Sequence, residues 1–190
     1  WLAVANTVLE LQERPVERAR IVGLVLSGSG EQVGEQSLDN TLGVELYESD
    51  GRATAAFRGE HAAAPGSEFI VDHVVLRSRD GEACITLLRD CLGIRLALDQ
   101  HKPEWGGRML FFRAGKMTLE VIVPEERKPK SDNFWGIALQ CPDLEQTAAR
   151  LKGQGVALSD IRDGRKPGTR VATAKSHTLG IPTLLIAPSS

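Results

Sequence analysis

"IVDHVVLRSRDGEACITLLRDCLGIRL", residues 70–96, is the stretch that decides the fold. An apolar run holds His73, and the segment behind Asp80 has apolar residues at helical spacing. An aspartate in that position caps the start of a helix, and Gly93 supplies the left-handed backbone conformation that ends one. The stretch therefore predicts a buried strand, a helix and a second strand in succession.

The same pattern occurs at two other places in the chain. The copies are "VGLVLSGSGEQVGEQSLDNTLGVELYESDGR" (22–52) and "WGIALQCPDLEQTAARLKGQGVALSDIRDGR" (135–165). His73 precedes Gly93 by 20 positions, and Gly136 precedes Gly155 by 19. A strand, a capped helix and a terminating glycine occupy about that many residues, so the chain is built from an internal repeat.

The closing strands of the repeat also correspond. "WLAVANTVLELQERP" (1–15) matches "FFRAGKMTLEVIVPE" (111–125), which places Glu10 opposite Glu120. "IPTLLIAP" (181–188) matches the same strand and has Leu184 at the glutamate position. The complete unit is a strand, a helix and three strands, with a hairpin turn at 114–116 between the last two strands.

This unit predicts the domain organisation. Residues 1–65 hold a truncated N-terminal pair of units, and residues 66–190 hold two full units at 70–124 and 133–188. Because Trp1 aligns with the third strand of a unit, we expect roughly 40 further residues before it in the natural protein; without them an edge strand lacks its partner.

The individual elements follow from the periodicity of the sequence. Helices are expected near 80–91 and 143–153. Strands are expected near 4–11, 20–26, 69–77, 94–99, 108–114, 117–123, 134–140, 156–159, 170–174 and 182–187.

Composition restricts the class of partner. The 190 residues carry a net charge of −2, which gives no reason to expect nucleic acid or an anionic membrane. No apolar run approaches the roughly 18 residues that span a bilayer. The three cysteines lack metal-site spacing, and Cys84 and Cys91 fall on one expected helix, which favours packing over a disulfide. We expect a cytoplasmic protein with a small-molecule ligand, with a homodimer as its assembly.

The motif "DHVVL…D…LLRDCLGIRL…MTLEVIVP" resembles the βαβββ module of the vicinal oxygen chelate superfamily, which includes glyoxalase I, bleomycin-resistance proteins and extradiol dioxygenases. The resemblance covers 70–188 well and 1–65 loosely. It implies an α+β fold in which paired modules form a cup-shaped mixed sheet, with the N-terminal module incomplete. In this family a ligand or metal lies in the cup, and metal ligands come from the first and last strands of a module.

Carried over to this sequence, the family's ligand positions are His73 and Glu120. The partner module has Gly136 and Leu184 at the same positions, and neither binds a metal. Gln140 shares a strand face with Gly136 and points inward, but it lies farther along the strand. A catalytic metal usually takes three protein ligands, so we expect a divalent zinc, iron, manganese or nickel ion to be weakly bound or absent.

Each of these residues has an ordinary structural interpretation. His73 either packs at the cup wall, binds a metal, or serves as a metal-free ligand or acid–base group. Glu120 contacts metal or substrate, is half exposed, or forms an ion pair with Arg113 or Arg77. Trp105 either overhangs the cup mouth, where it stacks on a flat ligand, or packs against the protein.

Two other motifs are set aside. His177 is interpreted as a surface turn residue before the last strand. Gly28 and Gly30 do not have the spacing of a phosphate-binding loop, and no lysine follows them.

Two functions from different classes remain. In the first, the protein is a metal-free binding module whose cup holds a small oxygenated molecule, with Arg77, Trp105, Arg113 and Gln140 as ligand-binding residues. In the second, it is a metal-dependent lyase or dioxygenase in which His73 and Glu120 hold the ion and Glu120 also moves a proton. The two missing ligand positions favour the binding module.

Overall fold

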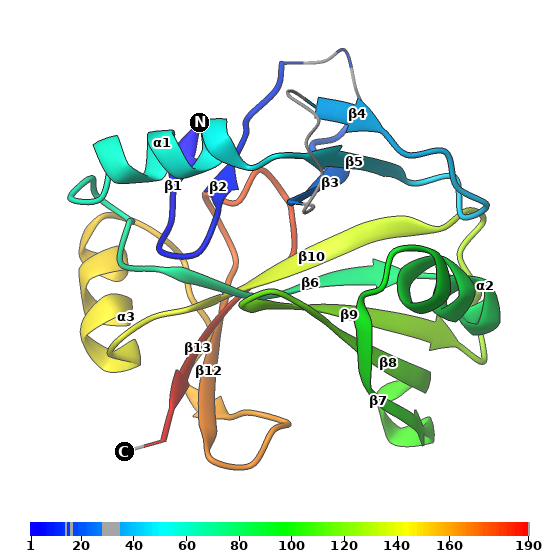
Figure 1. Cartoon of the computed structure of the whole chain (residues 1–190). Helices are drawn as coiled ribbons and strands as arrows, with labels where there is room; N and C mark the ends of the chain where they lie inside the picture. Colours follow the sequence, from blue (N-terminus) through cyan, green and yellow to red (C-terminus); the bar gives the residue numbers. More distant parts are fainter. Residues whose placement is uncertain (14, 16, 28–34, 190) are drawn as a thin grey trace. The chain divides into compact units, whose positions relative to one another are not determined.

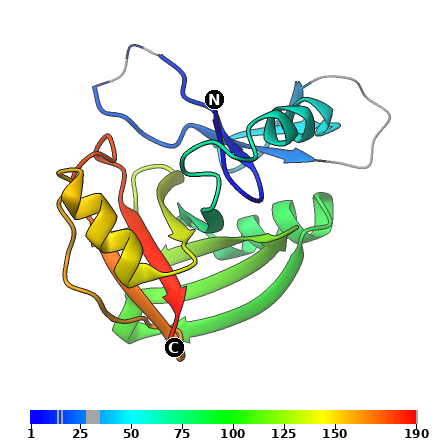
Figure 2. The same ribbon diagram turned by 90° about the vertical axis from the view of Figure 1, so that its left-hand side faces the viewer.

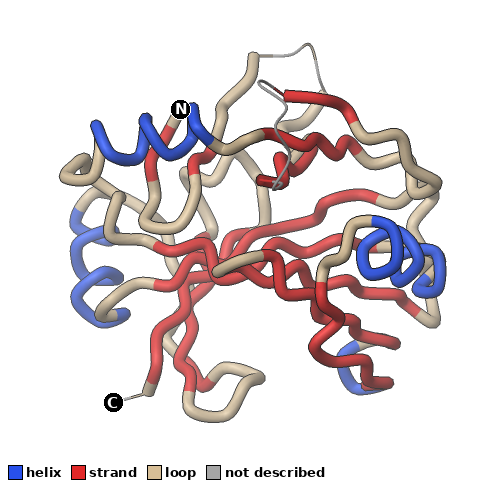
Figure 3. Tube along the Cα trace, in the orientation of Figure 1, coloured by secondary structure: helices blue, strands red, loops and turns tan. Residues whose placement is uncertain are grey.

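The computed structural model describes residues 1–13, 15, 17–27 and 35–189, so the interpretation of Gly28 and Gly30 lies outside the described residues. The fold is mixed α+β, as predicted, with many strands and few helices (Figures 1 and 3). The chain divides into two compact parts, which differ from the sequence repeats. The first part comprises 1–20, 56–72 and 136–190, and the second part comprises 21–55 and 73–135.

The stretch that opened the sequence analysis forms a βαβββ module, here called the first module. Its elements are β6 (Ile70–Arg77), α2 (Gly81–Ile85) continued by the π-helix η1 (Thr86–Cys91), β7 (Arg95–Lys102), the short 3-10 helix η2 (Pro103–Trp105), β8 (Gly107–Ala114) and β9 (Met117–Pro124). β6 pairs parallel with β9, and β7, β8 and β9 pair antiparallel in turn. The predicted order of elements is confirmed, with a parallel contact between the first and last strands.

The ends of the helical segment are formed as the sequence predicted. The Asp80 carboxylate accepts hydrogen bonds from the backbone N–H groups of Glu82 and Ala83, which otherwise have no partner in the first turn. Gly93 has a φ of 66°, and the chain reverses there into β7. The last six residues, Thr86–Cys91, are wound as a π-helix rather than an α-helix, which the sequence did not indicate.

The sheet of the first module has two different faces. Val74, Leu76, Leu110, Phe112, Leu119 and Val121 are all buried and form the core face. The opposite face carries alternating residues of the same strands, and these include His73 on β6 and Glu120 on β9. Because side chains alternate along a strand, residues paired across neighbouring strands share a face. We call this second face the polar face.

A second module repeats this arrangement. Its elements are β10 (Asn133–Gln140), α3 (Leu144–Gly153), β11 (Arg162–Asp163), β12 (Thr169–Ala174) and β13 (Thr183–Pro188). β10 pairs parallel with β13, β12 pairs antiparallel with β13, and β11 pairs with β12. Figure 2 shows α3 beside β12 and β13. The contact is a core of Cys141, Leu144, Ala172, Leu185 and Ala187.

The expected strand near 156–159 is wrong in extent. Its only described ladder contact is an isolated bridge from Leu158 to Ala174, and the paired strand β11 lies farther along. Leu158 packs against the core under α3, so the apolar residue is explained by burial rather than by a continuous ladder.

The N-terminal segment forms a hairpin rather than the single strand expected over 4–11. β1 (Leu2–Ala3) pairs antiparallel with β2 (Val8–Leu9). Residues 4–7 turn because the Asn6 side chain donates to the Val71 carbonyl and accepts from the Val71 N–H, both at 2.8 Å. Under the alignment with 111–125, the pairing of Leu2 with Leu9 is that of Phe112 with Leu119.

The segment 20–65 departs most from the repeat. It contains β3 (Gly23–Ser27), β4 (Glu35–Ser37), β5 (Glu45–Ser49) and α1 (Arg52–Glu60). β3 pairs parallel with β5, and β4 pairs antiparallel with β5. α1 was not expected, because its small and polar sequence lacks an apolar stripe. Among the described helices, none is long and apolar enough to cross a membrane.

Candidate functional site

His73 and Glu120 meet on the polar face of the first module. In the parallel register of β6 and β9, His73 faces Thr118, and Glu120 faces Val75 one pleat farther along. The His73 Nε2 and Glu120 Oε2 atoms are 3.6 Å apart. The two side chains are 19% and 14% exposed. The structure therefore brings together the two residues that the resemblance selected.

The separation of the His73 nitrogen and the Glu120 oxygen determines the kind of contact that they make. At 3.6 Å the nitrogen and oxygen are beyond a good hydrogen bond but within ion-pair range. An oxygen of a ligand can lie next to both atoms. The same two side chains would offer a divalent ion an imidazole nitrogen and a carboxylate oxygen as ligands.

The donor set does not complete a catalytic metal site. Within the described part of the chain, no three His, Cys, Asp or Glu side chains are grouped to hold an ion. At the position that matches His73, a Cβ added to Gly136 would lie 2.7 Å from the Pro182 carbonyl oxygen. The backbone of the second module therefore occupies the space that a ligand there would need.

Two predicted ligand-binding arginines lie on the polar face. Arg113 of β8 faces Thr118, and its Nη1 donates to the Thr118 Oγ1 at 2.7 Å. This bond turns the guanidinium toward the strand that neighbours His73. Arg77 lies four residues beyond His73 on β6, opposite Ile122, and is half-buried.

The other two predicted residues lie elsewhere. Trp105 belongs to η2, in the connection between β7 and β8, with the Lys102 ammonium 5.5 Å from its ring centre. From Arg113 to the start of β8 at Gly107 is about 20 Å at 3.4 Å per residue, so Trp105 is far from the level of His73 along the strand. Gln140 ends β10 in the second module, opposite Ile186.

The remaining histidine and glutamate of the sequence analysis are peripheral. His177 is exposed with a φ of 61°, and its Nδ1 lies 2.8 Å from the Ser176 hydroxyl, which confirms a surface turn. Glu10 follows β2 and is exposed, so it lacks the half-buried strand environment of Glu120.

The sequence analysis missed two residues in the row of paired positions that contains His73. Thr118 orients Arg113, and Arg95 of β7 lies directly opposite Arg113. The hairpin signal could have revealed Thr118, because a turn at 114–116 places residues 113 and 118 opposite one another. Arg95 could not be found this way, since a bulge between Leu96 and Leu98 shifts the register of β7.

The buried thiols are not candidates for a nucleophile. Burial raises the pKa of Cys84 to about 11, which keeps it protonated at neutral pH. Burial also raises the pKa of Cys141. All three cysteines are free; Cys84 and Cys141 are buried and Cys91 is exposed.

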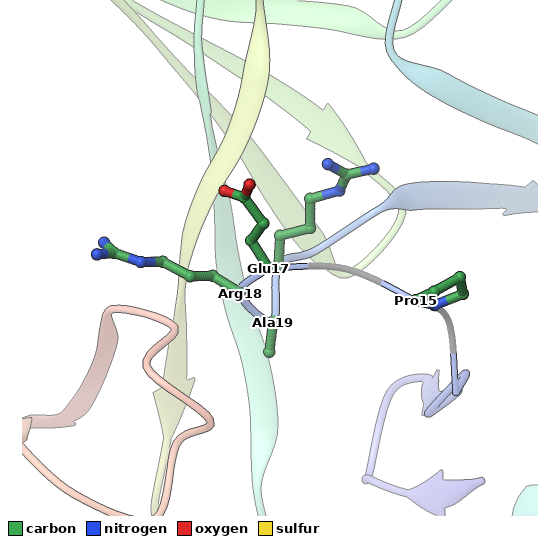
Figure 4. A pocket seen from close by; sticks show the side chains of 5 residues that line it. Pro15, Glu17, Arg18 and Ala19 are labelled. Carbon is green, nitrogen blue, oxygen red and sulfur yellow. The ribbon is translucent and has the colours of Figure 1, made fainter.

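A pocket of about 480 Å³ is lined by other residues. Figure 4 shows its lining residues Pro15, Glu17, Arg18 and Ala19, with the Glu17 and Arg18 side chains projecting in different directions. All lining residues come from the connection between β2 and β3, and all are exposed. We do not place the functional site there, because the lining is a single extended segment without converging polar groups.

Comparison with known proteins identifies the fold independently. A methylmalonyl-CoA epimerase from Mycobacterium tuberculosis matches with a TM-score of 0.53 and 20% identity, over 63% of this chain and 88% of that one. A hypothetical protein from Bacillus halodurans matches with a TM-score of 0.55 and 17% identity, over 64% and 96%. A Streptomyces coelicolor methylmalonyl-CoA epimerase variant in complex with 2-nitronate-propionyl-CoA matches with a TM-score of 0.51 and 19% identity, over 63% and 97%.

At these identities the structural matches show a shared fold alone; they carry no information about activity. The search of curated proteins gave no match. A family model described as Glyoxalase/Bleomycin resistance protein/Dioxygenase superfamily matches residues 72–173, more than half of the chain and most of both modules. This chain therefore belongs to the Glyoxalase/Bleomycin resistance protein/Dioxygenase superfamily.

Proposed function

We propose that the protein binds a small oxygenated molecule on the polar face of its first module, at His73 and Glu120. The observation that carries this proposal is the 3.6 Å approach of the His73 imidazole to the Glu120 carboxylate in half-buried surroundings. A carboxylate is costly to remove from water, and a fold that keeps one on a strand between buried residues usually gives it a partner or a ligand.

The two side chains supply complementary chemistry to such a ligand. The imidazole donates a hydrogen bond to a carbonyl or hydroxyl oxygen, and the carboxylate accepts one from a hydroxyl or acidic C–H group. When both side chains contact the same ligand, Glu120 accepts a proton from one ligand atom and His73 donates a hydrogen bond to the neighbouring oxygen. The pair is thus suited to binding alone or to proton transfer next to a carbonyl.

A metal-dependent lyase or dioxygenase is the alternative, and the nitrogen–oxygen spacing favours it. In that case His73 and Glu120 would hold a zinc, iron, manganese or nickel ion, which polarises two neighbouring substrate oxygens as a Lewis acid. Two protein ligands leave most of the coordination shell to water, so we expect weak affinity and easy removal by a chelator.

The structural neighbours suggest one further class of compound to test. One neighbour is described in complex with 2-nitronate-propionyl-CoA, and another with methylmalonyl-CoA and NH4+. Acyl-CoA thioesters carry an acidic C–H beside a carbonyl, the arrangement that the His73–Glu120 pair is suited to bind. The probe ligands for the test are therefore propionyl-CoA and mandelate, which carries a carboxylate beside a hydroxyl and a phenyl ring.

The test is direct and has matched controls. His73→Gln and Glu120→Gln keep the size of each side chain, and His177→Gln and Glu126→Gln make the same changes at exposed positions. We expect NMR shift changes on titration with at least one probe to vanish in the first two variants and persist in the controls. If no probe response depends on His73 or Glu120, the proposal is wrong.

Elemental analysis separates the two candidate functions. We expect well under one equivalent of divalent metal in protein purified without added metal salts and before any chelator is applied. A full equivalent at that stage, lost in His73→Gln, would establish the metal-dependent alternative instead.

A further inference from the structure

The polar face of the first module carries two arginines directly opposite each other. In the register of β7 and β8, Arg95 faces Arg113, and both side chains are exposed. Like charges at facing positions of an antiparallel pair destabilise a sheet. Among the described residues, no acidic side chain forms an ion pair with either arginine.

The two strands and the turn at this end of the hairpin add no acidic residue before Glu120. The segments 94–98 and 110–119, which form the two strands and the turn at this end, contain no Asp or Glu, and Lys116 adds a third cation in the turn. Elsewhere on the same hairpin, arginine is neutralised: Arg108 donates to both Asp99 oxygens and to Glu82. The opposed arginines are therefore an exception within their own hairpin.

The arginines lie in register with His73. Across the sheet, Arg95 faces Arg113, Arg113 faces Thr118, and Thr118 faces His73. The hydrogen bond from Arg113 to Thr118 fixes the guanidinium above this row. Two strand spacings, about 10 Å, separate the backbones of β8 and β6.

The next row supplies an apolar surface beside the arginines. Leu98 faces Phe111, and Phe111 faces Glu120. Leu98 is 48% exposed, although it lies in the middle of a strand. A ligand with an apolar body can therefore lie over Phe111, with one polar end at the arginines in the neighbouring row and the other at Glu120 on the next strand.

We propose that Arg95 and Arg113 bind the anionic group of the ligand, so that the substrate class is a small organic acid or phosphate with an apolar body and a second oxygen function for His73 and Glu120. This inference rests on the proposed function and assigns the ligand's charge. The paired guanidinium groups match the two oxygens of a carboxylate or phosphate, and the anion removes the repulsion between them.

The experiment compares probes that differ in charge alone. Mandelate carries a carboxylate beside a hydroxyl and a phenyl ring, and mandelamide is its neutral analogue; benzyl phosphate offers phosphate in place of carboxylate. We expect the full chain to bind mandelate or benzyl phosphate at least about tenfold more tightly than mandelamide. Added salt should weaken the binding of the anions and leave mandelamide unchanged.

Variants assign the effect to the two arginines. Arg95→Gln and Arg113→Gln should each remove most of the preference for the anion, whereas Arg162→Gln, at an exposed arginine of β11, should leave it intact. Whichever anion binds more tightly identifies the acid. Equal binding of mandelate and mandelamide, or an anion preference that survives both substitutions, overturns the inference.

The outcome also separates this inference from the proposed function. If the anion preference is absent but His73→Gln still weakens binding of both probes, the inference fails and the proposed function stands. If no probe binds to any form, both fail.

Discussion

The two modules of this chain share their scaffold and differ at the positions that bear chemistry. The pairing of Val75 with Glu120 in the first module recurs as the pairing of Ala138 with Leu184 in the second. An ion pair between the third strand and the first turn of the helix also recurs, as Arg108 with Glu82 and Arg170 with Glu145. The helix and sheet of each module are therefore joined in the same way.

One buried polar position has different partners in the two modules. In the first module the Ser78 hydroxyl donates to the Asp132 carboxylate at 2.6 Å, and in the second the aligned Cys141 thiol donates to the Ile186 carbonyl at 3.7 Å. Both positions are buried. Either arrangement gives the buried polar group a partner.

The His73–Glu120 pair has no counterpart in the second module, which has Gly136 and Leu184 there. The second module pairs its first, third and last strands in the same register without it. A histidine and a glutamate are therefore not needed to pair these strands. This difference is one reason why we propose that the two residues bind a ligand.

The largest effect should come from making the core of the first module resemble that of the second. Phe112 is completely buried, and Ala174 occupies the aligned position. We expect Phe112→Ala to lower the free energy of unfolding by about 3–5 kcal/mol, measured by urea denaturation. Phe111→Ala, on the half-exposed polar face, should cost clearly less. Equal losses would mean that the two faces are not distinguished by burial.

A smaller effect should show why the second module lacks the histidine. Any Cβ at Gly136 approaches the Pro182 carbonyl oxygen to 2.7 Å, so Gly136→Ala should lower the free energy of unfolding by about 1–3 kcal/mol. Gly153, in α3, has open space around its Cα. Gly153→Ala should therefore be neutral or stabilise by up to about 1 kcal/mol. The close approach is unimportant if both substitutions behave alike in thermal denaturation.

The smallest effect concerns acid stability of the first module. Hydrogen bonds from Arg108 hold the pKa of Asp99 below its ordinary value of 3.8. A lowered folded-state pKa contributes stability above the unfolded-state value, and this contribution disappears as the pH falls through the folded-state value. Asp99→Asn should therefore reduce the dependence of the free energy of unfolding on pH below about pH 4. The change should be less than about 1 kcal/mol, because the Asp99 side chain is 38% exposed and solvent weakens the ion pair. An unchanged acid profile would show that the pair does not stabilise the hairpin.

Local patterns in the sequence were sufficient for the elements of the two full modules. Asp80 and Asp143 accept backbone hydrogen bonds at the starts of their helices, and Gly93 and Gly155 have positive φ values at the ends. These features depend on neighbours within a few residues, so a single segment encodes them. The order of such segments predicted the α+β class, and the resemblance of their motif to a known module suggested the family that the family model confirms.

The structure of the N-terminal 65 residues was less predictable, because it depends on contacts between segments that are distant in the sequence. The hairpin of β1 and β2 turns at 4–7, where Asn6 bonds to the backbone of Val71, far away in sequence. α1 has no apolar stripe to announce it. A bond between distant segments leaves no periodic signal in either of them.

The sequence by itself determined that His73 and Glu120 would occupy inward positions of the first and last strands, since alternation along a strand fixes which residues share a face. Only the tertiary structure decided that the two side chains would meet at 3.6 Å, that Thr118 would hold Arg113 beside them, and that Arg95 would face Arg113. These contacts depend on the register between strands and on the bulge in β7. Register is set by the burial of a whole sheet face, which no single stretch of sequence contains.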